Sequence, residues 1–208
     1  METRRRTHAE RRAETRQALI DAAAWVFVER GFVGASVEAI AERAGYTRGA
    51  FYSNFASKEE LFAELLQQRV YAAYREMAAR SAGGERPSMR TTGERLAAIQ
   101  DHPEGRWLFR LWLELLAHAG RDESFRTIAA EFWRGNRELT ATAVQRGFEE
   151  AGSEPPLPPE WLATAMIALD IGLALQHFVD PERVPLEVYP ELYELLFGPL
   201  APNAGAGG

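Results

Sequence analysis

Side chains able to bind phosphate and a base edge lie together between Thr47 and Tyr52. The Thr47 hydroxyl, the Tyr52 phenol and the free amides at the start of a helix are donors suited to phosphate oxygens. Arg48 carries the planar guanidinium that pairs with a guanine edge, and Gly49 has no side chain to hold the backbone away from a duplex. These residue types predict a surface that contacts double-stranded DNA.

Two short helices joined by a tight turn are predicted to position these groups. Ser36 can cap a first helix, in which Val37 and Ile40 recur at helical spacing. Gly45 can adopt the positive φ that ends this helix, and Thr47 can cap a second helix that begins at about the next residue. Two helices joined by such a turn form a helix-turn-helix, whose second helix enters the major groove of DNA.

The second helix is predicted to have two faces. Phe51 and Phe55 lie four residues apart and are expected in the core. Arg48 and Tyr52 are also four apart and share a different face, which is free to bind a partner. The alternative interpretation is a helix pair that only packs, with Arg48 as solvated surface.

Composition excludes several classes of protein. The chain has 208 residues, 46% of them hydrophobic, and no cysteine, so it can bury a core but can form neither disulfides nor thiolate metal sites. The charged first twenty residues contain no signal-peptide pattern, and Asp170, Gln176 and His177 interrupt the longest apolar stretch, 161–179. The sequence lacks the nucleophile, zinc and phosphate-loop motifs of enzymes. We expect a cytoplasmic protein that is not an enzyme and has no membrane span, metal or cofactor.

The net charge of −6 is distributed unevenly. Residues 1–60 hold ten basic and nine acidic groups, whereas the rest of the chain holds fourteen basic and twenty-one acidic groups. The basic groups of the first part concentrate at Arg48, at Lys58 and in an amino-terminal arm. The first twenty residues contain Arg4, Arg5, Arg6, Arg11, Arg12 and Arg16. This arm could order against the DNA backbone or minor groove, or remain a solvated tail.

Apolar periodicity and capping residues predict further helices and hence an all-α fold. Ser57 and Glu60 form a capping box that opens a long helix, and Gly31 ends the helix before the helix-turn-helix. Residues 81–93 are expected to form a loop. The remaining helices are expected at about residues 9 or 13 to 30, 91 or 92 to 102, 104–120, 122–151, 161–179 and 186–197.

A series of motifs occurs in order between Leu19 and Leu61: Leu19-Ile20-Asp21-Ala22-Ala23, Phe27, Gly31-Phe32, Ser36-Val37-Glu38-Ala39-Ile40-Ala41, Ala44-Gly45-Tyr46-Thr47-Arg48-Gly49, Phe51-Tyr52, Phe55 and Ser57-Lys58-Glu59-Glu60-Leu61. This series resembles the DNA-binding domain of the TetR family of transcriptional regulators. The resemblance implies an arm and a three-helix DNA-binding domain over residues 1–56 and a helical ligand-binding and dimerisation domain over 57–200. It also implies a homodimer that binds a palindromic operator. Residues 201–208 have nothing to bury and are expected to form a disordered tail.

The resemblance assigns DNA contacts to residues of the motif. Asn54 departs from the family pattern, in which many members have His or another bulky residue at this position. The DNA-binding residues that the resemblance implies are Ser36, Thr47, Arg48, Gly49, Tyr52, Asn54 and Lys58.

The C-terminal domain is expected, from the same resemblance, to hold a ligand pocket and the dimer interface. Residues 107–133 resemble, more loosely, the C-terminal domains of the betaine-responsive repressor branch. Their aromatic side chains could line an apolar cavity with a few orienting polar groups, or could form ordinary core. The candidate ligand-binding residues are Trp107, Leu111, Trp112, Leu115, His118, Phe125, Phe132, Asn136 and Thr140. The candidate dimer-interface residues, on the last two helices, are Leu162, Ala165, Leu169, Gly172, Leu173, Leu192, Leu195 and Leu196.

Together these features predict a sequence-specific DNA-binding transcriptional regulator. The form we expect is a homodimeric repressor that a small, largely apolar ligand releases from its operator. The alternative is a chromosome-organising protein that uses the same scaffold without regulating a gene. The expected partners are operator DNA, a small-molecule effector and a second copy of the chain.

Overall fold

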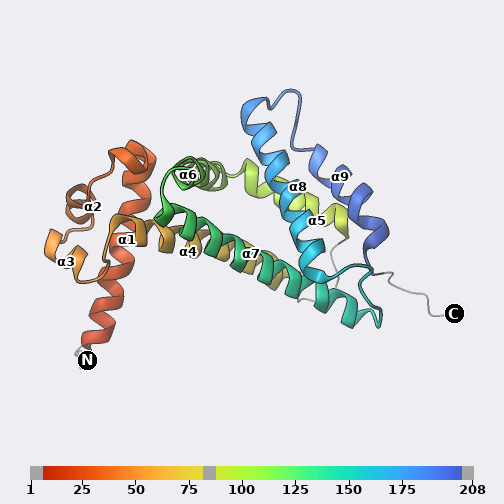
Figure 1. Ribbon diagram of the computed structural model, residues 1–208, viewed down its shortest axis with the longest axis horizontal. Helices are drawn as coiled ribbons and strands as arrows, with labels where there is room; N and C mark the ends of the chain where they lie inside the picture. Colours follow the sequence, from red (N-terminus) through yellow and green to blue (C-terminus); the bar gives the residue numbers. More distant parts are fainter. Residues whose placement is uncertain (1–6, 82–87, 203–208) are drawn as a thin grey trace, which may run out of the picture. The chain divides into compact units, whose positions relative to one another are not determined.

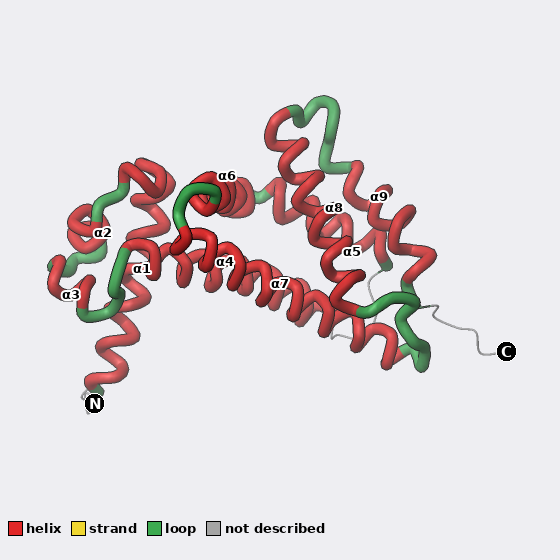
Figure 2. Tube along the Cα trace, in the orientation of Figure 1, coloured by secondary structure: helices red, strands yellow, loops and turns green. Residues whose placement is uncertain are grey.

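The computed structural model describes residues 7–81 and 88–202, and the regular structure within these ranges is helical (Figure 1, Figure 2). The all-α prediction is therefore confirmed. Arg4, Arg5 and Arg6 of the predicted arm, residues 82–87 of the expected loop and residues 203–208 of the predicted tail lie outside the described residues. The elements are α1 (His8–Gly34), α2 (Val37–Arg43), α3 (Arg48–Tyr52), α4 (Lys58–Ser81), α5 (Met89–Asp101), α6 (Pro103–Ala119), α7 (Glu123–Glu150), α8 (Pro159–Val179), α9 (Val188–Phe197) and the short 3₁₀ helix η1 (Gly198–Leu200).

Helix α1 has a defined start and a break near its end. The Thr7 side chain accepts a hydrogen bond from the Glu10 amide, and the Glu10 carboxylate accepts one from the Thr7 amide, which is a reciprocal capping box. The helix therefore begins just before the predicted Ala9. Gly31 adopts a φ of 67° and a ψ of 175°, so the regular helix ends there, as predicted.

The chain forms two compact units. Unit 1 consists of Met1–Val70 and Arg110–Phe132, and unit 2 consists of Tyr71–Phe109 and Trp133–Gly208. Helices α4, α6 and α7 therefore contribute residues to both units. The predicted domain boundary lies between residues 56 and 57, whereas the compact units divide within α4, α6 and α7. The boundary between a DNA-binding and a ligand-binding domain therefore stays a prediction.

Unit 1 has a core of aromatic and aliphatic side chains that supports α2 and α3. The ring centroid of Phe27 in α1 lies 5.5 Å from that of Phe32 and 5.4 Å from that of Phe62 in α4. Leu19 of α1 is fully buried. The core also includes Ala23, Val26, Ile40, Ala41, the predicted Phe51 and Phe55, Leu61, Leu65 and Leu66.

Unit 2 is organised around the packing of α5 on α9, with α8 against the same buried cluster. The phenol of Tyr193, which is buried in α9, donates a hydrogen bond to the Met166 carbonyl of α8 at 2.9 Å. A Cβ atom added to Gly93 of α5 would lie 2.6 Å from Cα of Pro190. Helices α5 and α9 therefore approach most closely at a position where a larger residue does not fit.

The predicted start of α5 at Thr91 or Thr92 is wrong. The helix begins at Met89, because the Ser88 hydroxyl accepts a hydrogen bond from the Thr91 amide at 3.1 Å and caps the helix earlier. The loop predicted for residues 81–93 therefore overlaps the start of α5. Helices α6, α7, α8 and α9 begin and end within about two residues of the predicted bounds, which is the usual uncertainty of helix ends.

Within the described residues, α8 is the one helix that is long and apolar enough to cross a membrane, judged by length and composition alone. One side of α8 is buried in unit 2 through Leu162, Ile167 and Leu173. Asp170 is buried in the same helix. One buried apolar side and a buried carboxylate are typical of a helix that packs in a protein core and has one face exposed.

Candidate nucleic-acid interface

The predicted caps of the helix-turn-helix are present. The Ser36 hydroxyl accepts a hydrogen bond from the Ala39 amide at 3.1 Å and starts α2, and the Thr47 hydroxyl accepts one from Ala50 at 3.2 Å and starts α3. Gly45 between the two helices has a φ of 75°. Capping uses each hydroxyl oxygen as an acceptor, which is compatible with donation of the hydroxyl hydrogen to a phosphate.

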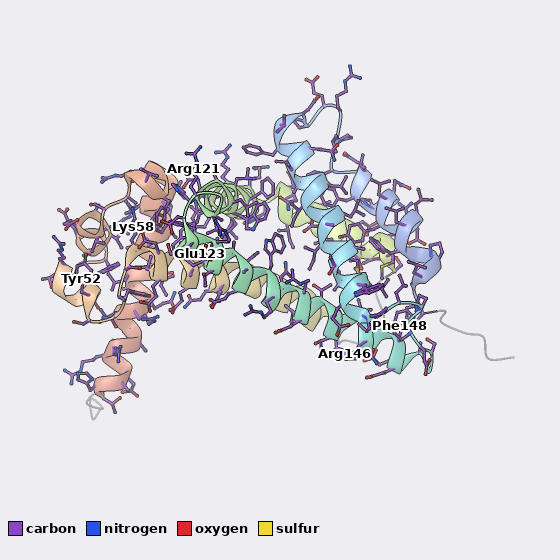
Figure 3. All side chains as sticks on the ribbon, in the orientation of Figure 1. Tyr52, Lys58, Arg121, Glu123, Arg146 and Phe148 are labelled. Atoms are coloured by element: carbon purple, nitrogen blue, oxygen red, sulfur yellow. The ribbon has the colours of Figure 1, made fainter. Side chains whose placement is uncertain are left out.

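Helix α3 has the two predicted faces. Phe51 is fully buried and Phe55, just beyond the helix, is 1% exposed. The ring of Tyr52 is 48% exposed and lies on the outer side of the helix (Figure 3). Arg48 is exposed on the same side as Tyr52, with its Cζ atom 5.4 Å from the ring centroid. The structure therefore brings together an exposed guanidinium and an exposed phenol above a buried support.

Gly49 adds an open approach to this face. A Cβ atom built at Gly49 would meet only the Thr47 hydroxyl oxygen, at 3.7 Å. The backbone at the start of α3 is therefore unobstructed by its own chain.

Arg48 has an acidic neighbour that sequence reasoning did not single out. Its Nη1 atom lies 2.8 Å from Oε1 of Glu38 in α2. The Tyr52 hydroxyl, and after it the carboxylate of Glu38, raise the pKa of Arg48 above its ordinary value. Arg48 is therefore held as a cation between a phenol and a carboxylate. Glu38 and Arg48 are ten positions apart and lie on different helices. Helical spacing predicts contacts within one helix only, so it does not reveal this ion pair.

Asn54 lies inside the unit and not on the exposed face of α3. Its side chain is buried, and its Nδ2 atom donates to the Ala50 carbonyl at 2.8 Å. Among the described residues, its Oδ1 atom accepts no hydrogen bond. The DNA contact implied for Asn54 stays a prediction that this placement does not support.

Lys58 at the start of α4 points into the unit (Figure 3). Its Nζ atom donates hydrogen bonds to the carbonyls of Phe32 and Ala35, both at 2.7 Å, and lies 4.2 Å from the ring centroid of Phe32. Burial lowers the pKa of Lys58, against the raising effect of Glu59. The Lys58 ammonium thus holds the main chain between α1 and α2. Lys58 therefore helps to position the helix-turn-helix.

Arg16 lies within α1, in agreement with a helix start at Ala9 or Ala13, and its side chain is partly buried. Its guanidinium forms a two-pronged ion pair with Glu64 of α4 and donates to the Asn54 carbonyl. It also lies 3.5 Å from the Glu60 carboxylate and 4.0 Å from the ring centroid of Phe55. Arg16 therefore joins α1, the end of α3 and the start of α4.

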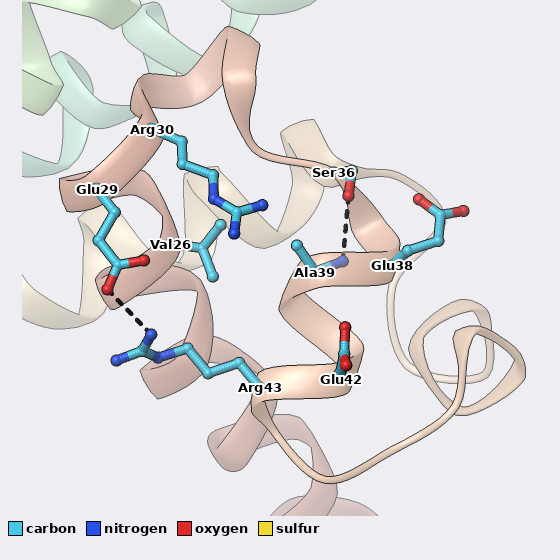
Figure 4. A pocket seen from close by; sticks show the side chains of 8 residues that line it. All are labelled: Val26, Glu29, Arg30, Ser36, Glu38, Ala39, Glu42 and Arg43. Carbon is cyan, nitrogen blue, oxygen red and sulfur yellow. Dashed lines mark hydrogen bonds and ion pairs between the residues drawn. The ribbon is translucent and has the colours of Figure 1, made fainter.

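A shallow, open hollow lies between α1 and α2 (Figure 4). Glu29 and Arg43 form an ion pair of 3.1 Å across it. None of the predicted ligand-binding residues lines this hollow. Its lining consists of Val26, Glu29, Arg30, Ser36, Glu38, Ala39, Glu42 and Arg43.

The candidate ligand-binding residues are divided between the two units. His118 in unit 1 stacks on Phe125, with centroids 4.9 Å apart, and lies 5.9 Å from the ring of Phe32. In unit 2, Oδ1 of Asn136 and Nε1 of Trp107 are buried and make no hydrogen bond among the described residues. Unit 1 contains Leu111, Trp112, Leu115, His118, Phe125 and Phe132, and unit 2 contains Trp107, Asn136 and Thr140.

The candidate dimer-interface residues are also of two kinds. Leu162 and Leu173 are buried within their own chain, because they face the core of unit 2. Ala165, Leu195 and Leu196 are exposed, and Leu169, Gly172 and Leu192 are half-buried. Sequence reasoning missed four large, exposed apolar residues on α8, namely Phe178 and, on one stripe, Trp161, Leu175 and Val179. The spacing of this stripe with Ala165, Ala168 and Gly172 follows the helical period, which was the signal available in the sequence.

Comparison with known families places both parts of the chain among bacterial regulators. Residues 19–65 match the family model described as bacterial regulatory proteins, tetR family. Residues 96–194 match the model described as BetI-type transcriptional repressor, C-terminal.

Individual proteins show the same similarity over most of the chain. The HTH-type transcriptional repressor DhaR of Mycobacterium sp. strain GP1 is 28% identical over 182 residues, which are 86% of this chain and 89% of DhaR. A crystal structure described as a TetR-family transcriptional regulator from Rhodococcus sp. has a TM-score of 0.72 and 27% identity, and covers 91% of this chain and 99% of its own. The multidrug binding protein EbrR, crystallised with proflavin, has a TM-score of 0.61 and 25% identity, over 88% and 99% of the respective chains.

Proposed function

Because the chain belongs to the TetR family of bacterial transcriptional regulators, we propose that it is a homodimeric repressor released from a palindromic operator by a small, largely apolar ligand. The observation that carries the proposal is the exposed pair of Arg48 and Tyr52 above the buried Phe51 and Phe55. The buried aromatic residues hold the two polar side chains in place. Arg48 and Tyr52 therefore lose less conformational entropy when they bind a DNA groove.

Each residue of the exposed pair has its own task on DNA. The Arg48 guanidinium donates to the O6 and N7 atoms of a guanine in the major groove. The Tyr52 hydroxyl donates to a backbone phosphate, with Thr47 and Ser36 at the starts of the two helices as further phosphate donors. The phosphate contacts set the register of the protein on the duplex, and the arginine reads sequence.

The exposed faces of α8 and α9 form the dimer interface in this proposal. Trp161, at 67% exposed, and Leu195, at 68%, are large apolar side chains in contact with water in the single chain. Aromatic and leucine side chains of this kind gain the hydrophobic free energy of burial when a second copy covers them. A dimer places two recognition helices on half-sites one or more turns of DNA apart.

In this proposal the effector binds in unit 2, beside Trp107 and Asn136. Asn136 is buried, and its amide oxygen would accept a hydrogen bond that the described chain does not supply. The indole nitrogen of Trp107 likewise would donate one. Aromatic walls with few polar groups suit a small, largely apolar molecule, as does the similarity to EbrR, a multidrug binding protein crystallised with proflavin.

The test is binding of the purified protein to the DNA that flanks its own gene, with random DNA of equal length as competitor at two salt concentrations. We expect saturable binding that survives the competitor, because base contacts add to the salt-dependent phosphate contacts. Arg48→Ala should weaken this binding by about 5- to 150-fold, which is the range for one lost base contact.

Arg146→Ala is the matched control. Arg146 lies on α7 in unit 2, where it pairs with Glu150 at 3.6 Å, and it is 52% exposed at the side chain. Arg146→Ala removes one positive charge from unit 2, whereas α3 belongs to unit 1. The affinity for the operator should therefore change by no more than about twofold. Equal binding of flanking and random DNA, with a steep salt dependence, would instead favour the chromosome-organising alternative.

A further inference from the structure

The arginine that the proposed function assigns to base reading already binds a carboxylate of its own chain. Nη1 of Arg48 lies 2.8 Å from Oε1 of Glu38, in the first turn of α2. The guanidinium also lies near the Tyr52 ring, 5.4 Å from its centroid. The side chains of Arg48 and Glu38 are 64% and 57% exposed, so the ion pair lies on the surface that DNA would cover.

This ion pair has little to contribute to folding. Water and salt screen both charges of an exposed pair, and the two long side chains lose rotamer freedom when they meet. Its geometric effect is larger, because Glu38 and Tyr52 together restrict the direction of the guanidinium. Glu38 also places a negative charge beside the position of the phosphate backbone, where it opposes binding of any DNA sequence.

We propose that Glu38 is a specificity-determining residue that acts through Arg48. The inference rests on the proposed function, since it requires that Arg48 reads a base. A guanidinium has five N–H donors, so Arg48 can keep its bond to Glu38 while other donors bind a guanine edge.

The penalty falls on DNA of the wrong sequence. Without a guanine edge, the available acceptor for Arg48 is a phosphate, and reaching it breaks the bond to Glu38. The carboxylate is then left without its cation next to phosphates, which is electrostatically unfavourable. Glu38 therefore weakens binding to random DNA more than binding to the operator.

The experiment compares the wild-type protein with Glu38→Gln, which removes the charge and keeps the shape of the side chain. Dissociation constants are measured for the flanking operator DNA and for random DNA of the same length. We expect binding to random DNA to tighten by about five- to tenfold and binding to the operator to change by less than about threefold. The ratio of the two constants, which measures specificity, falls accordingly.

Glu29→Gln is the matched control. Glu29 lines the same hollow as Glu38 (Figure 4) and forms an ion pair of 3.1 Å, but its partner is Arg43. The loss of this charge should change binding to both DNAs by the same factor. If Glu38→Gln also changes both by one common factor, Glu38 only repels phosphate and the proposal is overturned.

A double-mutant cycle tests the route through Arg48. In an Arg48→Ala background, Glu38→Gln should leave the ratio of the two dissociation constants unchanged, because the residue through which Glu38 acts is absent. A fall in the ratio that is as large without Arg48 as with it would overturn the proposal. If the wild-type protein itself fails to distinguish operator from random DNA, the proposed function fails first, and the inference that rests on it fails with it.

Discussion

The carboxylate of Glu114 in α6 accepts a hydrogen bond from the main-chain amide of Phe32, with a distance of 2.7 Å between Oε2 and N. This amide follows Gly31, where the φ of 67° interrupts α1. The carbonyl of Phe32 accepts a hydrogen bond from Lys58 of α4. Glu114 therefore binds the main-chain amide of Phe32, and Lys58 binds its carbonyl. Phe32 lies four residues before Ser36, which caps the first helix of the helix-turn-helix.

Replacing Gly31 by Ala is expected to destabilise the protein more than replacing Gly45 by Ala. Both glycines have positive φ values, 67° and 75°, which cost any residue with a Cβ atom energy. The new Cβ atom at Gly31 would also lie 2.7 Å from Oε1 of Glu114, whereas nothing lies within 4 Å at Gly45. Denaturant unfolding should show losses of about 2 to 4 kcal/mol for Gly31→Ala and about 1 kcal/mol for Gly45→Ala.

A Glu114→Ala background supplies the control for this comparison. Without the carboxylate, the excess loss at Gly31 should shrink, because the steric part of the penalty is removed. Equal losses of unfolding free energy for Gly31→Ala and Gly45→Ala would contradict the close approach of Glu114 to Gly31. The same holds if the larger loss for Gly31→Ala persists in the Glu114→Ala background.

Arg16→Ala is expected to lower stability although the residue belongs to an arginine-rich segment. The change leaves Glu64, whose side chain is 25% exposed, without its two-pronged partner and removes the cation over the Phe55 ring. We expect a loss of about 1 to 3 kcal/mol in the free energy of unfolding. Arg126→Ala, which removes an exposed ion pair with Glu123, should cost less than about 0.5 kcal/mol. Similar melting temperatures for the two variants would show that Arg16 is a surface residue after all.

The local parts of the helix-turn-helix were predictable because each acts within a few residues of chain. A serine or threonine before an apolar helical period indicates a cap, and Ser36 and Thr47 both accept the expected hydrogen bonds. A glycine between two helices indicates a positive φ, which Gly45 adopts. The same reasoning misplaced the start of α5, because Ser88 lies in a stretch whose Gly, Ser and Thr content predicted a loop.

Contacts between distant residues were not predictable from one sequence. Arg16 is one of several arginines in the first twenty residues, and nothing local marks out its partner Glu64, which lies 48 positions later. Leu162 and Leu173 fit the apolar pattern of an interface helix and are buried in their own chain. In a helix that is apolar on most sides, the helical period groups residues into stripes but does not show which stripe meets its own core and which meets a partner.

The exposed stripe on α8 leads to a prediction about assembly. Trp161→Glu should raise the dissociation constant of the proposed dimer by about 30-fold or more, because a charge would replace a large aromatic side chain within the proposed apolar contact. Light scattering after size-exclusion chromatography measures the mass at micromolar concentration. Val33→Glu is the control, since Val33 is 74% exposed on α1 in unit 1 and should leave the mass unchanged. A dimer of wild-type stability in Trp161→Glu would place the interface elsewhere.

Hydroxyl-radical footprinting of the DNA that flanks the gene tests most directly that this chain reads an operator as a dimer. We expect two protected patches related by a palindrome, with centres about 34 to 36 Å or a multiple of this distance apart. Both patches should disappear with Arg48→Ala and remain with Arg146→Ala. Weak protection spread evenly along the fragment, the same for both variants, would show that the chain does not read an operator as a dimer.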